Sequence, residues 1–566
     1  MCGVTRVGQK SNRYWRKPET LRRSLPAVKL SAMSEIVLAT LNAKYIHASF
    51  GLRYLMANLG DLRSRASIHE FDINQKVNDI AEALLELNPK IIGFGIYIWN
   101  VVPSTELVVI LKRLRPDITL ILGGPEVSYE TEGQPIVAAA DYVITGEADL
   151  FFAGMCQQIL GGARPSTKVH AAPLPDFSRI ALPYDFYTEA DIAHRVIYLE
   201  ASRGCPFTCE FCLSSLDIPV RQVPLPAFLA ALEKLIQRGV RHFKFVDRTF
   251  NLNIAVSKAI LEFFLERYRP GDFYHFEMIP DRLPEALREI ISRFPPGSLQ
   301  FEIGIQTFNE EVGERIKRRQ NYARLAENFE YLRSRTGVHL HADLIVGLPG
   351  ESLESFAGGF DRLVSLKPQE IQVGILKRLR GTTLSRHDEE WGMVYNLLAP
   401  YELLQNRSLD FSSMQRLRRF SKYWEMISNS GNFLETVALF WKPSKSVHQL
   451  AGLLSRESDD SPFFSFLHWS DWLYTRVGRT DSIALVRLME LSFRFLTTVK
   501  NHTEKEVAES LGRDYQRGGR KDRPAFLREF LPQAATRVAA RTSTRLLPVR
   551  QSRHATSEVV LGTDLP

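Results

Sequence analysis

The sequence is poor in cysteine and has no long hydrophobic run, and both absences narrow its function. Only five cysteines occur among 566 residues, too few and too unevenly spaced for the disulfide framework of a secreted protein. The longest apolar runs, such as residues 91–99, have the length of a strand and cannot span a membrane. The first 30 residues are basic and lack the apolar core of a secretory signal. We therefore expect a cytoplasmic protein without membrane association.

The middle of the chain has no excess of positive charge, because the positive charges behind the net charge of +8 are concentrated at the two ends. We interpret residues 1–32 as a basic extension, either disordered or upstream of a true start at Met33. Residues 511–566 are interpreted as a basic, weakly structured tail. Binding to nucleic acid would need a folded basic face with interleaved aromatic residues. We therefore do not expect a nucleic-acid partner.

Three of the five cysteines, Cys205, Cys209 and Cys212, lie within eight residues. Crowded thiolates repel one another unless a metal neutralises them, so this spacing predicts a metal site. Structural zinc and fully ligated iron–sulfur clusters normally take four protein ligands. Three thiolates on a [4Fe–4S] cluster would leave one iron open to bind another molecule, which predicts chemistry at the cluster. The alternative is a zinc site completed by a distant His or by Cys156.

Residues 35–160 alternate strand-like and helix-like segments, which predicts a doubly wound, Rossmann-like parallel sheet with helices on both faces. The expected strands are 36–41, 67–73, 91–98, 119–122 and 142–144. Ligands bind such sheets beyond the C-terminal ends of the strands, where small residues let a large flat ligand approach the backbone. The candidate ligand contacts at these strand ends are Asn42, Gly93, Gly123, Gly124, Gly146 and Glu147.

After a linker at 161–195, rich in Pro, Gly and Ala, residues 196–383 contain six further strand–helix units. Their expected strands are 196–200, 243–246, 273–278, 299–304, 340–346 and 370–375. Six units are too few to close an eight-stranded barrel, so we predict an open partial (β/α)6 barrel with its mouth at the strand C-termini. The three cysteines directly follow the first of these strands.

The Cys-x3-Cys-x2-Cys spacing after a first barrel strand resembles the signature of the radical S-adenosylmethionine (SAM) superfamily. The resemblance implies a [4Fe–4S] cluster on Cys205, Cys209 and Cys212, with SAM on the open iron. Reductive cleavage of SAM would then give a 5′-deoxyadenosyl radical. For Asp247, a helix cap or an ion pair with Arg248 is the alternative role. The positions that correspond to SAM contacts in that superfamily are Phe211, Asp247, Glu302, Gln306 and Gly347.

Residues 35–160 resemble the cobalamin-binding domain that precedes the barrel in many radical SAM enzymes. The resemblance implies that the six strand-end contacts named above bind cobalamin. The Asp-x-His-x-x-Gly motif, which supplies an axial cobalt ligand in other cobalamin proteins, is absent here. Tyr45 stands in place of its Asp, and Gly51 lies four residues after His47. Without a carboxylate partner to orient it, His47 is expected to be a hydrogen-bonding loop residue and not a cobalt ligand.

Residues 384–510 are predicted to form a C-terminal helical domain, since aromatic and aliphatic residues recur there at helical spacing. The expected helical segments are 401–404, 414–426, 433–440, 463–475 and 483–497. The region resembles an uncharacterised helical domain found behind some cobalamin-dependent radical SAM proteins. It is expected to serve as a substrate lid or as a structural cap.

These resemblances together imply a cobalamin-dependent radical SAM enzyme, related to class B radical SAM methyltransferases and to anaerobic Mg-protoporphyrin IX monomethyl ester cyclases. They favour methylation of an unactivated carbon or phosphorus in a small-molecule substrate. The electron donor is expected to be a protein such as flavodoxin or ferredoxin. The alternatives are a radical cyclase or rearrangement enzyme, and a non-catalytic iron–sulfur or zinc sensor. We assign no catalytic residue beyond the cofactor contacts.

Overall fold

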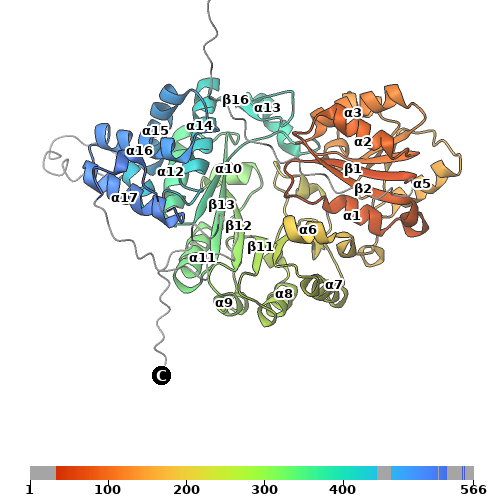
Figure 1. Cartoon of the computed structure of the whole chain (residues 1–566), viewed down its shortest axis with the longest axis horizontal. Coiled ribbons are helices and arrows are strands. Elements are labelled where there is room, and N and C mark those ends of the chain that lie inside the picture. The colour runs from red at the N-terminus through yellow and green to blue at the C-terminus, as the bar shows by residue number, and fades with distance from the viewer. Residues whose placement is uncertain (1–33, 443–460, 521, 532–550, 552–553, 555–566) are drawn as a thin grey trace, which may run out of the picture.

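The structure is a computed structural model that describes residues 34–442, 461–520, 522–531, 551 and 554 (Figure 1). The N-terminal domain, the barrel and the helical C-terminal region follow one another from red through green to blue. The predicted extension at 1–32 and most of the predicted tail at 511–566 lie outside the described residues.

The N-terminal domain contains a six-stranded parallel sheet in the order β2-β1-β3-β4-β5-β6. The strand order reverses between β1 and β3, which is where doubly wound sheets bind their ligands. One hydrophobic cluster packs α2 and α3 on one face, and a second packs α1 and α5 on the other. The prediction of a Rossmann-like sheet is confirmed. The elements are β1 (Ile36–Asn42), α1 (Phe50–Ala57), β2 (Ala66–Asp72), α2 (Val77–Glu86), β3 (Ile91–Gly95), α3 (Val101–Leu114), β4 (Thr119–Gly123), α4 (Pro135–Ala139), β5 (Tyr142–Thr145), α5 (Phe151–Leu160) and β6 (Val169–Ala171).

The segment predicted to be a linker at 161–195 contains regular structure. Its strand β6 pairs with β5 and extends the first sheet beyond residue 160. Its helix α6 (Glu189–His194) begins with a capping box between Thr188 and Asp191. A three-residue strand and a six-residue helix are too short to give a periodic pattern, which is why composition alone indicated a linker.

The central domain contains a second six-stranded parallel sheet, in the order β14-β13-β12-β11-β10-β7. Its two ends, β14 and β7, do not pair with each other in the described residues, so the partial (β/α)6 barrel is confirmed. The elements are β7 (Ile197–Leu199), α7 (Leu225–Gln237), β10 (His242–Phe245), α8 (Ile254–Glu266), β11 (Phe273–Met278), α9 (Glu285–Ser292), β12 (Leu299–Gln306), α10 (Glu310–Arg315), α11 (Tyr322–Arg335), β13 (His339–Val346), α12 (Leu353–Ser365) and β14 (Glu370–Ile375).

The barrel strands alternate aromatic and polar side chains, and the alternation sorts them to opposite faces of the sheet. In β10 and β11, Phe243 and Tyr274 are buried and pack against Phe264 of α8. The intervening residues, such as His275 and Glu277, therefore face the barrel interior. The interior of this barrel is polar, while its outer face packs on the helices.

The C-terminal region packs on the β14 side of the barrel, where α14 and α15 lie against α12 and β14. Its aromatic side chains form the core, with Trp469 and Tyr423 fully buried. Two of the expected segments differ in the structure: 401–404 leads into strand β16 and is not helical, and 433–440 has only a short 3-10 helix at Val437–Phe440. The elements are α13 (Asp388–Trp391), β15 (Val394–Tyr395), β16 (Leu403–Gln405), α14 (Phe411–Ile427), α15 (Pro462–Val477), α16 (Leu485–Thr498) and α17 (Glu504–Arg517).

The error at 401–404 has a local cause. Leu403 donates its backbone N–H to the carbonyl of Leu376 at 2.8 Å, so an extended partner fixes this segment as a strand. A segment of four residues is too short for a periodicity that distinguishes a strand from a helix. Helix α17 also extends to Arg517 and so includes the first seven residues of the predicted tail, 511–517.

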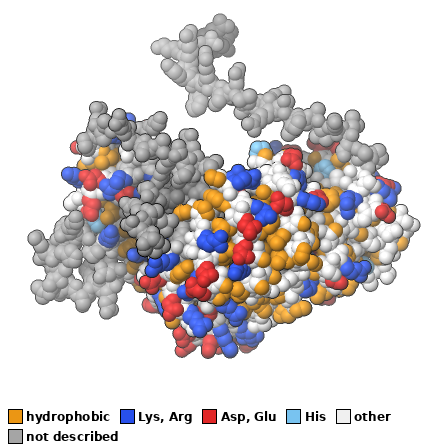
Figure 2. All heavy atoms as spheres, turned by 90° about the horizontal axis from the view of Figure 1, so that it is seen from below, with side chains coloured by type: hydrophobic (Ala, Val, Ile, Leu, Met, Phe, Trp, Pro, Cys, Tyr) orange, Lys and Arg blue, Asp and Glu red, His pale blue; other side chains and the backbone are white. Residues whose placement is uncertain are grey.

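No helix in the described part of the chain is both long enough and apolar enough to cross a membrane. Seen from below, the molecular surface has basic, acidic and hydrophobic side chains interspersed over the described residues (Figure 2).

Candidate active site

The three cysteines lie on one loop, residues 204–212, which we call the cysteine loop. It follows the short strand β8 (Ser202–Arg203) and begins at Gly204, whose φ is +97°. A Cβ on Gly204 would lie 2.6 Å from the carbonyl oxygen of Asp217, so only glycine fits at this position. Cys205 donates its N–H to the same carbonyl at 3.1 Å. The turn is therefore held by backbone contacts before any metal binds.

The sulfur atoms are sheltered and lie close to a positive charge. Cys205 and Cys209 are buried, Cys212 is half-buried, and none of the three forms a disulfide. Burial raises the pKa of Cys205 and Cys209, while Arg318 opposes this rise. Nη1 of Arg318 lies 3.9 Å from Sγ of Cys209. This donor set fits an anionic iron–sulfur cluster, because burial disfavours bare thiolates and metal binding neutralises them.

A single metal ion suits the arrangement less well. Among the residues that the structure describes, no group of three or more His, Cys, Asp or Glu is placed to hold one ion. A [4Fe–4S] cluster is larger, and each of its thiolate ligands binds a different iron. The spacing of the three thiols on the loop therefore favours the cluster over the zinc alternative.

Glu210 anchors the cysteine loop to the rest of the protein. It lies between Cys209 and Cys212 in the sequence, and its side chain has no solvent exposure. It contacts His387 and Arg386 at 2.7 Å each and Lys317 at 3.2 Å. Sequence reasoning missed this anchor, because its partners lie more than 100 residues away in the sequence.

Asp247 contacts the residues that lead into the cysteine loop, and Phe211 lies within the loop. Asp247 follows β10 and accepts hydrogen bonds from the N–H of Ala201 at 3.0 Å and from the hydroxyl of Ser202 at 2.7 Å. Burial raises the pKa of Asp247 to about 7, although the hydrogen bonds from Ser202 and Ala201 oppose the rise. Phe211 is half-buried and packs against the barrel core. In this structure, Asp247 fixes the backbone that leads into the loop, and its predicted SAM contact remains a prediction.

Glu302 and Gln306 lie on β12, with Glu302 in the barrel interior. Glu302 lies 2.9 Å from Nε2 of His275 and 3.4 Å from Nζ of Lys244. Burial raises its pKa, but the hydrogen bond with His275 and the charge of Lys244 outweigh burial and hold the pKa well below its usual range. Gln306, at the strand end, has a φ of +74°. Left-handed backbone at a non-glycine residue is strained by about 1–3 kcal/mol and often marks a functional site.

Gly347 directly follows β13, in a turn that contacts the C-terminal region. Its φ is +90°, and a Cβ there would lie 2.4 Å from Cδ2 of Leu403. Asn406 donates a hydrogen bond to the carbonyl of Gly347 at 3.2 Å. This glycine is therefore required by packing, independently of its predicted contact with SAM.

The barrel interior holds further ionisable groups besides the predicted SAM contacts. His341 contacts Asp343 at 3.3 Å and Glu370 at 3.1 Å, and Arg248 contacts Glu277 at 3.5 Å. A polar residue at every second position of otherwise buried strands was the signal that could have identified them. Burial raises the pKa of Glu277 to about 7, although Arg248 opposes the rise.

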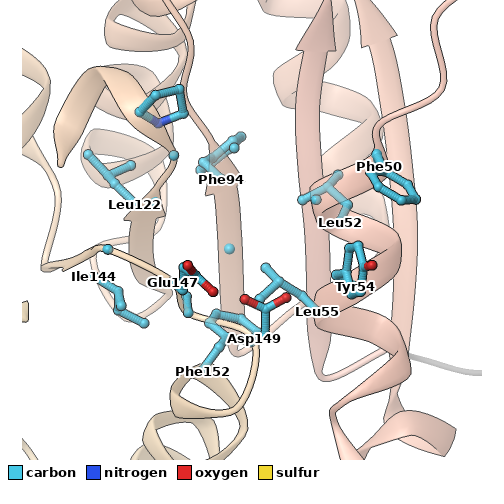
Figure 3. Close-up of a pocket in the computed structure, with 18 of the residues that line it drawn as sticks. Phe50, Leu52, Tyr54, Leu55, Phe94, Leu122, Ile144, Glu147, Asp149 and Phe152 are labelled. Carbon is cyan, nitrogen blue, oxygen red and sulfur yellow. The ribbon is translucent and has the colours of Figure 1, made fainter. Parts of the chain in front are cut away.

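A cavity of about 400 Å³ opens at the C-terminal strand ends of the first sheet; we call it the strand-end cavity (Figure 3). Apolar side chains such as Phe94, Leu122 and Phe152 form much of its wall. The carboxylates of Glu147 and Asp149 provide its polar side. Five of the six predicted cobalamin contacts line it: Gly93, Gly123, Gly124, Gly146 and Glu147.

The sixth predicted contact, Asn42, does not line this cavity. Its side-chain amide donates to the carbonyl of His47 at 2.8 Å and to Glu70 at 3.0 Å. His47 in turn lies 2.6 Å from the hydroxyl of Tyr198 on β7. The prediction that His47 is a hydrogen-bonding loop residue is confirmed.

The cavity and the cysteine loop meet at Arg203, two residues before Cys205. Arg203 lines the cavity and contacts Glu147 at 2.7 Å, Asp149 at 3.0 Å and Glu200 at 2.9 Å. Burial raises the pKa of Glu147, but hydrogen bonds and charges from Arg221 and Arg203 outweigh it and hold this pKa below its ordinary value. One guanidinium thus joins the wall of the strand-end cavity to the start of the cysteine loop.

Comparisons with known proteins agree with this geometry. The radical SAM superfamily matches residues 199–363, and the B12-binding domain matches residues 36–155. A family of unknown function, DUF4080, matches residues 389–547.

Two curated proteins illustrate the range of relatives. The chain is 27% identical over 167 residues to the ribosomal protein uS12 methylthiotransferase RimO of Trichlorobacter lovleyi, covering 28% of this chain and 37% of that protein. It is 22% identical over 412 residues to an uncharacterized methyltransferase of Pyrococcus horikoshii, covering 66% of this chain and 83% of that protein. The chain thus spans little more than a third of the length of RimO.

Two solved structures share the fold. The radical SAM methyltransferase TsrM of Kitasatospora setae has a TM-score of 0.52 at 16% identity, over 67% of this chain and 80% of that one. The cobalamin-dependent SAM radical enzyme OxsB has a TM-score of 0.55 at 13% identity, over 85% of this chain and 78% of that one.

The chain therefore contains a radical SAM domain, preceded by a B12-binding domain and followed by a DUF4080 region. Its cofactors are a [4Fe–4S] cluster, SAM and cobalamin. The non-catalytic sensor considered from the sequence is therefore not supported.

Proposed function

We propose that this enzyme methylates an unactivated carbon or phosphorus atom of a small molecule. The observation that carries the proposal is the position of Arg203, which lines the strand-end cavity and lies two residues before Cys205. A methyltransferase that uses both cofactors needs their sites next to one another. The methyltransferase names of TsrM and of the Pyrococcus protein support the same reaction class.

When bound, the cluster and SAM supply the electron and the 5′-deoxyadenosyl radical, and cobalamin supplies the methyl group. Cys205, Cys209 and Cys212 would hold the cluster, with Arg318 beside Cys209. The glycines of the strand-end cavity would admit the corrin, and its apolar wall would exclude water. Phe211, Asp247, Glu302, Gln306 and Gly347 remain the proposed SAM contacts. A protein donor such as flavodoxin or ferredoxin would reduce the cluster.

The test is an anaerobic reaction of the reconstituted enzyme with cobalamin, a reductant and SAM that carries a deuterated methyl group. We expect both 5′-deoxyadenosine and S-adenosylhomocysteine, with the label recovered in the corrin fraction. Each S-adenosylhomocysteine accounts for one methyl group that has left SAM. Formation of 5′-deoxyadenosine alone, with no methyl transfer, would favour the cyclase or rearrangement reaction and overturn the proposal.

A further inference from the structure

Residues 376–405, which we call the brace segment, follow β14 and turn back so that residues 401–403 lie beside residues 376–378. The two arms pair in antiparallel fashion: Arg378 donates its N–H to the carbonyl of Tyr401 at 3.1 Å, and Leu403 donates to Leu376 at 2.8 Å. In Figure 1, α13 and β16 of this segment lie at the top of the molecule, between the C-terminal helices and the N-terminal domain. The brace segment includes the beginning of the DUF4080 region, which starts at residue 389.

One part of the brace segment forms hydrogen bonds with a buried carboxylate of the N-terminal domain. The side chain of Glu126 is 4% exposed and accepts hydrogen bonds from the hydroxyl of Tyr401 at 2.5 Å and from Nε of Arg380 at 2.9 Å. Arg380 also donates to the Tyr401 hydroxyl at 3.0 Å. Glu126 directly follows Gly124-Pro125, which lines the strand-end cavity. These hydrogen bonds therefore fix the residue that directly follows the cavity wall.

A second set of contacts lies next to the hydrogen bonds with Glu126. Arg378 contacts both carboxylate oxygens of Glu130 at 3.1 and 3.2 Å, and the N–H of Gly381 donates to Glu130 at 3.1 Å. Gly381 has a φ of +81°, and a Cβ there would lie 2.4 Å from the ring of Tyr129. The turn of the brace segment thus lies directly against the N-terminal domain.

The other part of the brace segment holds the cysteine loop. Arg386 and His387 both contact Glu210 at 2.7 Å, and the Glu210 side chain has no solvent exposure. Glu210 lies between two cluster ligands, so this contact fixes the loop where the cluster would bind. Charges buried this deeply are held strongly by their partners, because an unpaired buried carboxylate is costly.

We propose that the brace segment sets the separation and orientation of the two cofactor sites, with Glu126 and Glu210 as its anchors. The same short segment contacts the wall of the cobalamin cavity and the loop of the cluster ligands. Of these contacts, Tyr401 lies within the DUF4080 region, whereas Arg380, Arg386 and His387 precede its start at residue 389. The proposal rests on the presence of both cofactors in the proposed function.

The test uses electron paramagnetic resonance of the holoenzyme, reduced so that cob(II)alamin and the [4Fe–4S] cluster are both paramagnetic. The cluster accelerates the relaxation of the cobalt signal by an amount that depends steeply on their separation. For Glu126→Gln and Tyr401→Phe, we expect the relaxation enhancement to fall at least two-fold. We also expect a broader distribution of cobalt–cluster distances. The cluster spectrum measured without cobalamin should stay unchanged in both variants, whereas Glu210→Gln should alter it.

The matched control is Glu35→Gln, which removes a carboxylate paired with Lys90 beside the start of β1, at the opposite end of the sheet from the strand-end cavity. It should retain the full enhancement. If both Glu126→Gln and Tyr401→Phe bind both cofactors and keep the wild-type enhancement, the proposed positioning role of the brace segment is wrong. If Glu126→Gln fails to fold, Tyr401→Phe decides, because it removes a single hydroxyl. Absence of a cobalt or cluster signal from the wild type would instead count against the proposed function.

Discussion

The strand-end cavity is built largely from glycines and apolar side chains, whereas the cysteine loop is built from thiols held in place by charged residues. In the cavity wall, glycines allow close packing, since a Cβ on Gly124 would lie 2.5 Å from the carbonyl oxygen of Ile96 and one on Gly93 would lie 2.8 Å from the ring of Phe152. In the loop, the thiols that would bind metal and the carboxylate of Glu210 that anchors the loop must be present. The two sites should therefore fail for opposite reasons: the cavity when atoms are added, and the loop when functional groups are removed.

The largest effect is expected from removing thiols of the cysteine loop. In a variant with Cys205, Cys209 and Cys212 all changed to Ala, the iron content should fall from about four atoms per chain to nearly none. Cleavage of SAM should be lost, while cobalamin binding to the separate strand-end cavity should persist. Iron analysis, 5′-deoxyadenosine formation and the visible corrin spectrum measure these outcomes.

Cys156→Ala is the control for this change. Cys156 is buried in α5, and burial raises its pKa to about 12, so it is an unreactive core residue. This variant should keep its full iron content. Loss of iron from Cys156→Ala, or retention of four irons by the triple variant, would contradict the assignment of the cluster to the loop.

Adding one methyl group to the cavity wall tests the other half of the comparison. Gly124 has a φ of +104°, and a Cβ there would lie 2.5 Å from the carbonyl oxygen of Ile96. Gly124→Ala should destabilise the N-terminal domain by about 1–3 kcal/mol. It should also weaken cobalamin binding and leave the iron content unchanged, as measured by corrin titration and iron analysis.

Gly133→Ala is the matched control, because Gly133 has a φ of +75° but a Cβ there would meet nothing within 4 Å. It has a similar backbone cost without the steric clash and lies outside the cavity wall. Equal cobalamin affinity in the two alanine variants would show that the cavity wall tolerates added atoms, contrary to the comparison.

The two domains should also differ in their response to pH. In the N-terminal domain, the described carboxylates with a shifted pKa all have it lowered; they are Glu35, Asp117, Glu130 and Glu147. In the barrel, burial raises the pKa of Glu351 to about 7, although its hydrogen bond from Thr307 opposes the rise. The folded barrel therefore binds a proton that the unfolded chain releases near pH 4.5.

This shift predicts that the barrel loses stability as pH rises from about 5 to 7, by up to about 1.4 kcal/mol per pH unit for one proton. Above the folded-state pKa the loss levels off. Glu351→Gln removes the titrating group, so its stability should vary less over this range. Urea unfolding at pH 5, 6, 7 and 8 measures the difference. A wild type and variant with parallel pH profiles would rule out this role for Glu351.

The smallest effect is expected at Arg318, which contacts Cys209 without binding metal. A positive charge and an N–H donor beside a cluster sulfur stabilise the more negative, reduced cluster. Arg318→Met should therefore lower the reduction potential by roughly tens of millivolts while iron content is retained. A redox titration followed by electron paramagnetic resonance gives the potential. Arg318→Lys, which keeps the charge, should recover part of the shift; an unchanged potential in both variants would exclude the contact as a determinant.

Much of the fold could be predicted because its signals are local. The six barrel strands and five of the six strands of the first sheet follow periodic patterns within single segments. Strand β6 and the segment at 401–404 could not be assigned correctly, because their conformations depend on partners elsewhere in the chain. Among the site residues, the glycines of the strand-end cavity were predicted from their places at strand ends. Asn42 occupies the same kind of place, yet its side chain faces His47 and Glu70.

The sequence by itself determined the kind of chemistry, because Cys205, Cys209 and Cys212 lie on one short loop and need no distant partner to define a metal site. Only the tertiary structure decided how that loop is held and where it lies relative to the second cofactor site. Glu210 and His387 are 177 residues apart in the sequence, and Glu126 and Tyr401 are 275 apart. The sequence around either residue of such a pair has no pattern that predicts its partner. Packing of the two sheets and the brace segment brings them together, and burial then makes each contact strong.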